Sequence, residues 1–152
     1  MARKHNPADP PPTISDATLR GFSGYVMKRA FNAIQADVNA SLAPLDLRML
    51  TFSALSVIVD NPGLRQSQLA DALSIERPNL VIVVDELERR DLILRNPAPG
   101  DRRAYALQAT LKGMRLYTKA LGAVQAHEAR MTKGLSEDER QALIAMLSRI
   151  ET

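Results

Sequence analysis

The stretch that decides the fold is residues 64–93, LRQSQLADALSIERPNLVIVVDELERRDLI. Apolar residues recur in both halves of this stretch at spacings typical of one helix face: Leu69, Ala70 and Leu73, then Leu80, Val84 and Leu87. Pro78 suits the first turn of the second helix, where its missing N–H needs no partner. Two short helices joined by a tight turn, the second one longer, are typical of a helix-turn-helix.

A β-hairpin is predicted directly after these helices. Residues 92–95 and 102–109 flank a loop, 97–101, that contains two prolines and a glycine. In the second segment, Tyr105 and Leu107 lie at alternating positions, as in a strand with one buried face. A hairpin behind a helix-turn-helix is a wing, and we expect the winged domain to span residues 45–109, with its recognition helix at about 77–91.

Helices are predicted on both sides of this domain. Residues 14–44 carry two adjacent apolar stripes, which indicates burial on more than one side and favours contact with a second subunit. Asp46 is a plausible N-cap for a further helix that ends near Val59. The Pro-rich residues 1–13 are expected to form a disordered arm.

The last part of the chain, residues 110–152, is also predicted to be helical. Thr110 can cap a long helix that stops at Gly134, and Ser136 with Glu139 forms a capping box for a final one. Because these helices have no obvious mate in so short a chain, we expect 14–44 and 110–152 to be dimerisation helices.

Composition narrows the class of protein. The chain has 152 residues, 45% hydrophobic and 24% charged composition, no cysteine and a formal net charge of +3. Zero cysteine excludes disulfides, Cys-based zinc sites and thiol redox switching. With no apolar run long enough for a membrane span and no signal peptide, we expect a soluble, cytoplasmic protein.

Three segments resemble the MarR family of bacterial transcription regulators. Residues 66–75 (QSQLADALSI) and 84–93 (VDELERRDLI) are similar to its helix-turn-helix, and 101–103 (DRR) fits its Asp-x-Arg wing signature. Residues 107–113 (LQATLKG) are similar to the junction that follows. The resemblance implies a mainly α fold with a small β-hairpin wing (α+β class) and a homodimer that binds palindromic double-stranded DNA. Ser74 departs from the family pattern, since glycine is often found there.

The resemblance and the chemistry of base edges together single out a set of candidate DNA-binding residues. Arg77 can pair with guanine, Asn79 with adenine, and the methyls of Ile82 can contact thymine. Arg103 would approach the minor groove, oriented by Asp101. The full set is Ser67, Arg77, Asn79, Ile82, Arg95, Asp101, Arg102 and Arg103.

Alternatives remain open at this stage. Val81 and Ile82 could equally pack in the core or in a dimer interface, and Asn79 could cap its own helix. Residues 65–103 carry equal numbers of basic and acidic side chains, so net charge alone does not predict DNA binding.

The family also commonly senses a small aromatic acid or its CoA thioester. The resemblance implies a pocket between the dimerisation helices and the winged domain, with these candidates: Phe22, Tyr25, Arg29, Arg48, Phe52 and His127. An arginine fork such as Arg29 or Arg48 could hold a carboxylate or phosphate. The alternative is that Phe22 and Phe52 are core residues and Arg48 a surface residue.

Enzymatic functions are disfavoured. No Gly-x-Ser-x-Gly elbow or Gly-rich phosphate loop occurs, and His127 stands alone on a predicted helix, so we expect no catalytic residue, no metal and no cofactor. The favoured function is a ligand-responsive repressor. An activator of the same family, or a winged-helix module that contacts proteins without specific DNA readout, is the alternative.

Replacing Arg103 tests the assignment of the wing. We expect Arg103→Ala to weaken operator binding strongly, because it removes a cation from the minor groove, while leaving dimerisation intact. A gel shift with size-exclusion chromatography measures both, and unchanged affinity would refute the assignment.

Overall fold

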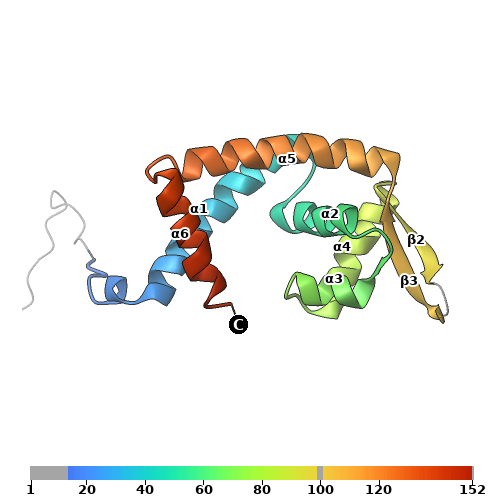
Figure 1. The fold of residues 1–152 in the computed structure, drawn as a ribbon, viewed down its shortest axis with the longest axis horizontal. Helices are drawn as coiled ribbons and strands as arrows, with labels where there is room; N and C mark the ends of the chain where they lie inside the picture. The colour runs from blue at the N-terminus through green and yellow to red at the C-terminus, as the bar shows by residue number, and fades with distance from the viewer. Residues whose placement is uncertain (1–13, 99–100, 152) are drawn as a thin grey trace, which may run out of the picture. The chain divides into compact units, whose positions relative to one another are not determined.

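The computed structural model describes residues 14–98 and 101–151, and the side chains within them except at 98 and 101–104. The residues predicted as a disordered arm, 1–13, lie outside this range. Two compact units, residues 1–33 and 34–152, are considered separately. The elements, in chain order (Figure 1), are the 3-10 turn η1 (Leu19–Gly21), α1 (Ser23–Leu42), η2 (Ala43–Leu45), α2 (Met49–Asp60), β1 (Leu64–Arg65), α3 (Gln66–Ala72), α4 (Arg77–Arg89), β2 (Ile93–Ala98), β3 (Asp101–Ala109), α5 (Leu111–Met131) and α6 (Glu137–Ser148).

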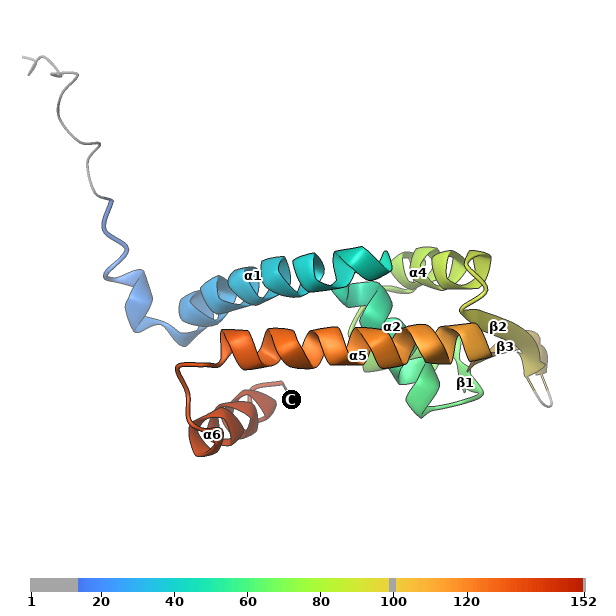
Figure 2. The ribbon, with the colours of Figure 1, turned by 90° about the horizontal axis from the view of Figure 1, so that it is seen from above.

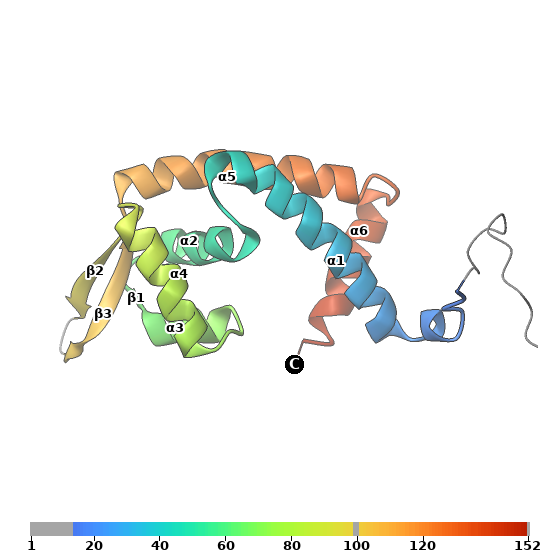
Figure 3. The ribbon, with the colours of Figure 1, turned by 180° about the vertical axis from the view of Figure 1, so that it is seen from behind.

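The main core of the larger unit lies where α2, α3, α4 and the sheet meet (Figure 3). Fully buried side chains come from each: Leu55 and Ile58 from α2, Leu69 from α3, Leu80 from α4 and Leu107 from β3. Each such side chain contributes about 1.5–3 kcal/mol through the hydrophobic effect. The mainly helical fold with a small antiparallel sheet is the one predicted from the sequence.

The sheet contains one strand more than predicted. β2 and β3 pair as the expected antiparallel hairpin, and β1 adds to the free edge of β3, with Leu64 opposite Leu107. The N–H of Gly63, at a positive φ of 89°, also donates to the carbonyl of Leu107 at 2.8 Å. β1 is too short to show the alternation that marks a strand in sequence.

The turn between α3 and α4 holds a serine in the left-handed region. Ser74 has a φ of 51°, and the N–H of the next residue, Ile75, donates to the carbonyl of Ala70 at 3.1 Å, which closes the end of α3. A non-glycine residue in this conformation costs about 1–2 kcal/mol. Glycine would adopt this conformation without that cost, so the serine found here makes the turn less stable than a glycine would.

The start of α2 differs from the prediction. Asp46 was expected to cap it, but Asp46 has a φ of 54° and ends η2, and α2 begins at Met49. The side chain of Asn39 accepts the N–H of Met49 at 2.8 Å, and Thr51 accepts the N–H of Arg48 at 2.9 Å. Asn39 lies on α1, so this cap is invisible to a local sequence rule.

The junction between the wing and α5 is unusually close. Thr110 Oγ1 accepts the N–H of Gly113 at 2.9 Å, which confirms the predicted cap, and the Thr110 N–H donates to the Leu92 carbonyl at 3.0 Å. A Cβ added at Gly113 would lie 2.0 Å from the same carbonyl oxygen. From this junction α5 runs alongside α2 (Figure 2).

A second, smaller core joins α5 to the last turns of α1. It contains Val38 and Leu42 from α1, Leu47, and Ala120 from α5. The final helix, α6, begins at the predicted capping box, in which the Ser136 N–H donates to the Glu139 carboxylate at 2.7 Å. In contrast to α5, α6 buries none of its side chains within this chain.

Within residues 14–98 and 101–151, no single helix has the length and apolar character of a membrane span. Only α1 and α2 taken together reach them, by length and composition. The apolar character of α2 has a simpler explanation, because Ala54, Leu55 and Ile58 form part of the main core.

Gly113 and Gly122 offer a matched pair of tests in one helix. Gly113→Ala should lower the free energy of unfolding by about 1–3 kcal/mol, because the new methyl collides with backbone that cannot rotate away. Gly122 meets nothing within 4 Å, so Gly122→Ala should raise stability by up to about 1 kcal/mol through helix propensity. Urea unfolding followed by circular dichroism measures both. Equal stability of the two variants would contradict the close packing at the junction.

Candidate nucleic-acid interface

The first half of α4 presents an exposed face. Arg77 and Asn79 are exposed, and Ile82 and Val81 are 66% and 42% exposed, whereas Leu80 between them is fully buried. Val81 and Ile82 therefore do not pack in the core of this chain, which removes one of the two alternatives. No side-chain hydrogen bond of Asn79 occurs among the described residues, so its amide is not used as a local cap.

Ser67 belongs to the neighbouring helix. It lies in the first turn of α3 and is half-buried, and the exposed Arg65 precedes it at the end of β1. Residues of α3 and α4 are in contact (Figure 3).

Arg95 has a different environment from the one expected. Its guanidinium forms ion pairs with Asp85 and, at 2.8 Å, with Glu88, both on the second half of α4, and its side chain is only 20% exposed. These two carboxylates compete with any phosphate for this guanidinium. It joins the first strand of the wing to α4.

The remaining acidic residue of this helix half is also paired. Glu86 accepts from Arg48 at 3.0 Å and lies 3.8 Å from Arg90. The acidic second half of α4 is thereby neutralised within the chain. By contrast, Arg77 forms no ion pair with a carboxylate of the described residues, although the exposed Glu76 precedes it in the chain. Sequence reasoning missed these pairs because Arg48 is far from Glu86 in the chain.

The tip of the wing can be described only in part. Asp101, Arg102 and Arg103 belong to strand β3, but their side chains lie outside what the structure describes.

Comparison with known proteins fits this geometry. A model described as MarR family matches residues 45–104 of the chain. A solved structure of the transcriptional repressor CouR, bound to a 23-mer DNA duplex, is 37% identical, with a TM-score of 0.88 over 93% of this chain and 100% of that one. This chain belongs to the MarR family. The resemblance seen in the sequence is thus confirmed, and the family consists of transcriptional regulators rather than enzymes.

Two further proteins that are similar to this chain bear on its function. CouR bound to p-coumaroyl-CoA is 35% identical, with a TM-score of 0.83 over 91% of this chain and 98% of that one. A putative transcriptional regulatory protein for the hcr operon of Thauera aromatica is 39% identical over 99 residues, 65% of this chain. The match spans 60% of that relative's length, less than two thirds.

Three of the expected effector-binding residues of this MarR family member lie in the smaller unit. Tyr25 donates its hydroxyl to Asp16 at 2.8 Å, and Arg29 lies 3.8 Å from the same carboxylate and 5.8 Å from the centre of the Tyr25 ring. The hydrogen bond from Tyr25, followed by that from Arg20, lowers the pKa of Asp16. Phe22 is 62% exposed rather than a core residue.

The other three lie in the larger unit. Phe52 stacks on Tyr117 with ring centres 6.2 Å apart and packs against the smaller core, in agreement with the core alternative. Arg48 is exposed and bound to Glu86, as described above.

His127 is buried in a polar cluster between α5 and the end of α1. Its Nδ1 lies 2.6 Å from Asp37, and Arg130 donates to the same carboxylate at 2.8 Å. The hydrogen bond from His127, followed by that from Arg130, lowers the pKa of Asp37. His127 therefore fastens two helices together in this structure.

The salt dependence of DNA binding separates a structural arginine from a phosphate-binding one. Arg95→Gln should lower stability by about 1–2 kcal/mol, because it leaves Asp85 and Glu88 unpaired at a partly exposed site, but should not change the slope of log affinity against log salt. The matched variant Arg77→Gln should flatten that slope, by about 0.9 if the lost contact is to a phosphate. A flatter slope for Arg95→Gln would show that Arg95 contacts DNA after all.

Proposed function

We propose that this protein is a sequence-specific DNA-binding repressor that acts as a homodimer in the cytoplasm. The observation that carries the proposal is the exposed face on the first half of α4, where Arg77, Asn79 and Ile82 stand clear of the core. The likeness to CouR solved with a DNA duplex supports it.

The proposed complex places the start of α4 in the major groove. Arg77 contacts guanine and Asn79 contacts adenine through paired hydrogen bonds, each of which contributes about 1–3 kcal/mol of discrimination between bases. Ile82 supplies an apolar surface for the thymine methyl. The wing then lies over the backbone, with Arg103 at the minor groove and Asp101 orienting it.

The final helix supports the homodimer. Its large apolar side chains are all at least 40% exposed: Leu143, Ile144, Met146 and Leu147. The same holds for Ile150, just after the helix. Exposed apolar patches of this kind mark protein interfaces. A two-fold axis between two copies would set the half-sites of a palindromic operator about 10–10.5 bp apart, or a multiple of that distance.

A small aromatic acid or its CoA thioester is the proposed effector. The support is the likeness to CouR solved with p-coumaroyl-CoA, together with the Tyr25–Arg29 pair, which offers an aromatic face and a guanidinium within one helix turn. Such a ligand releases the operator only if it binds more tightly to the form of the dimer that does not bind DNA.

Asn79→Ala tests base readout directly. Losing a paired hydrogen bond should relax the preference at one position in each half-site and leave binding to the remaining positions unchanged. Fluorescence anisotropy with the DNA upstream of the gene, and with single-base variants of it, measures the preference. Asn32→Ala, an exposed asparagine on α1, is the matched control and should bind like the unaltered protein.

The same assay tests the whole proposal. The unaltered protein should bind the upstream DNA with strong salt dependence, and a phenolic acid or its CoA thioester should release it. No binding at low salt would overturn the repressor assignment, and binding that no such compound reverses would overturn the effector assignment alone.

A further inference from the structure

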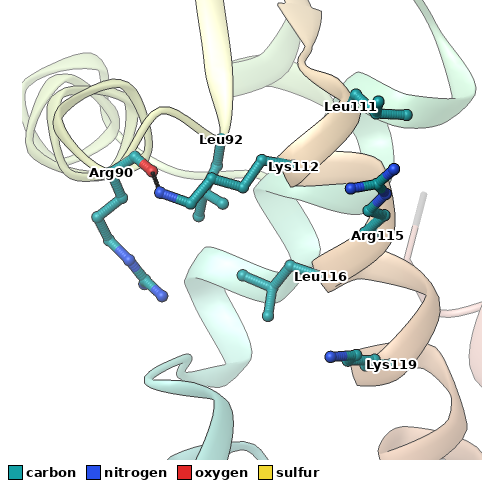
Figure 4. A pocket seen from close by; sticks show the side chains of 7 residues that line it. All are labelled: Arg90, Leu92, Leu111, Lys112, Arg115, Leu116 and Lys119. Carbon is teal, nitrogen blue, oxygen red and sulfur yellow. Dashed lines mark hydrogen bonds between the residues drawn. The ribbon is translucent and has the colours of Figure 1, made fainter.

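A hollow of about 630 Å³ lies beyond the C-terminal end of α4, against the first half of α5 (Figure 4). Three leucines form its apolar part: the buried Leu92 just before β2, and Leu111 and Leu116 on α5. Leu111 is 64% exposed, although it sits beside buried core residues. The volume is that of an ordinary small-molecule site.

Four cationic side chains complete the lining of this basic groove: Arg90, Lys112, Arg115 and Lys119. Two of them serve the fold, since Arg90 donates to the carbonyl of Asp46 and Lys112 donates to that of Arg90 at 2.7 Å. Arg115 and Lys119 are both exposed, and neither forms an ion pair with a carboxylate of the described residues.

The spacing of the charges on α5 is unfavourable for the helix alone. Lys112, Arg115 and Lys119 follow one another at intervals of three and four residues, so they lie on one face, and like charges at such spacing destabilise a helix. A bound anion would remove this repulsion. The groove is also separate from the proposed DNA surface. Arg77 lies at the first residue of α4 and the groove beyond its last, and α4 is about 18 Å long.

We propose that the basic groove binds a small organic oligophosphate, an anion that carries an apolar or aromatic part, as a nucleoside diphosphate does. Arg115 and Lys119 hold the phosphates through charge-assisted hydrogen bonds, and the exposed Leu111, with the partly exposed Leu116, contacts the apolar part. A purely inorganic anion would leave Leu111 uncovered. The proposal does not depend on the DNA role, because the two binding events are measured separately.

ADP is the probe for this site. Isothermal titration of the full-length protein, without DNA, should show saturable ADP binding, and ADP should raise the melting temperature. Adenosine, which lacks the phosphates, should do neither. The double variant Arg115→Gln/Lys119→Gln should bind ADP about tenfold more weakly or worse, while Lys133→Gln, which removes an exposed lysine elsewhere, should bind it normally.

The double variant should fold at least as well as the unaltered protein, because it removes repulsion on an exposed helix face. Its melting temperature without ADP checks this. Absence of any ADP effect, an equal effect of adenosine, or undiminished binding by Arg115→Gln/Lys119→Gln would each overturn the proposal. So would displacement of ADP by a short DNA duplex of unrelated sequence, which would make the groove a nucleic-acid surface.

Discussion

The close approach of α5 to the end of the recognition helix is the contact on which the remaining structure depends. The side chain of Lys112 and the hydroxyl and N–H of Thr110 donate, in turn, to the three consecutive backbone carbonyls of residues 90–92. The carbonyls of Glu86, Leu87 and Glu88 at the end of α4 accept from the N–H groups of residues 90–92, and the start of α5 supplies donors for the carbonyls of residues 90–92 themselves. Only a residue without a Cβ permits this approach, and Gly113 is that residue. The contact between α5 and the segment that follows α4 therefore rests on the backbone of Thr110 and Gly113 as well as on the side chains of Thr110 and Lys112.

The acidic side chains in the second half of α4 are paired with arginines of the same chain. Residues 65–103 carry as many acidic as basic side chains, yet the acidic ones on α4 are bound by Arg48, Arg90 and Arg95. These pairs fix the second half of α4 against the wing and against α2. The first half keeps Arg77 without an ion pair among the described residues, next to the exposed Glu76. Partly exposed pairs such as those of the second half are screened by salt.

Features governed by neighbours in sequence were predictable, and those governed by distant residues were not. The Thr110 cap, the Ser136 capping box, the hairpin and the buried faces of α3 and α4 each follow from residues within one or two turns. The pairing of β1 with β3 did not, because it joins residues 64 and 107. The cap on α2 was misassigned to Asp46 for the same reason: its acceptor, Asn39, lies on another helix. Among the candidate DNA contacts, exposure supports Arg77, Asn79 and Ile82. Arg95 instead forms ion pairs with Asp85 and Glu88, which only the folded chain brings close to it.

The lack of any buried side chain on α6 has a consequence for how the protein responds to its own abundance. The large apolar residues of α6 are 40–54% exposed in the chain, so covering the exposed part of their surface with a second copy would add hydrophobic stabilisation. With the proposed homodimer, part of the folding free energy is then an association free energy, and it varies with the logarithm of protein concentration. Synthesis level would therefore set not only how many operators are occupied but also how well each molecule is folded.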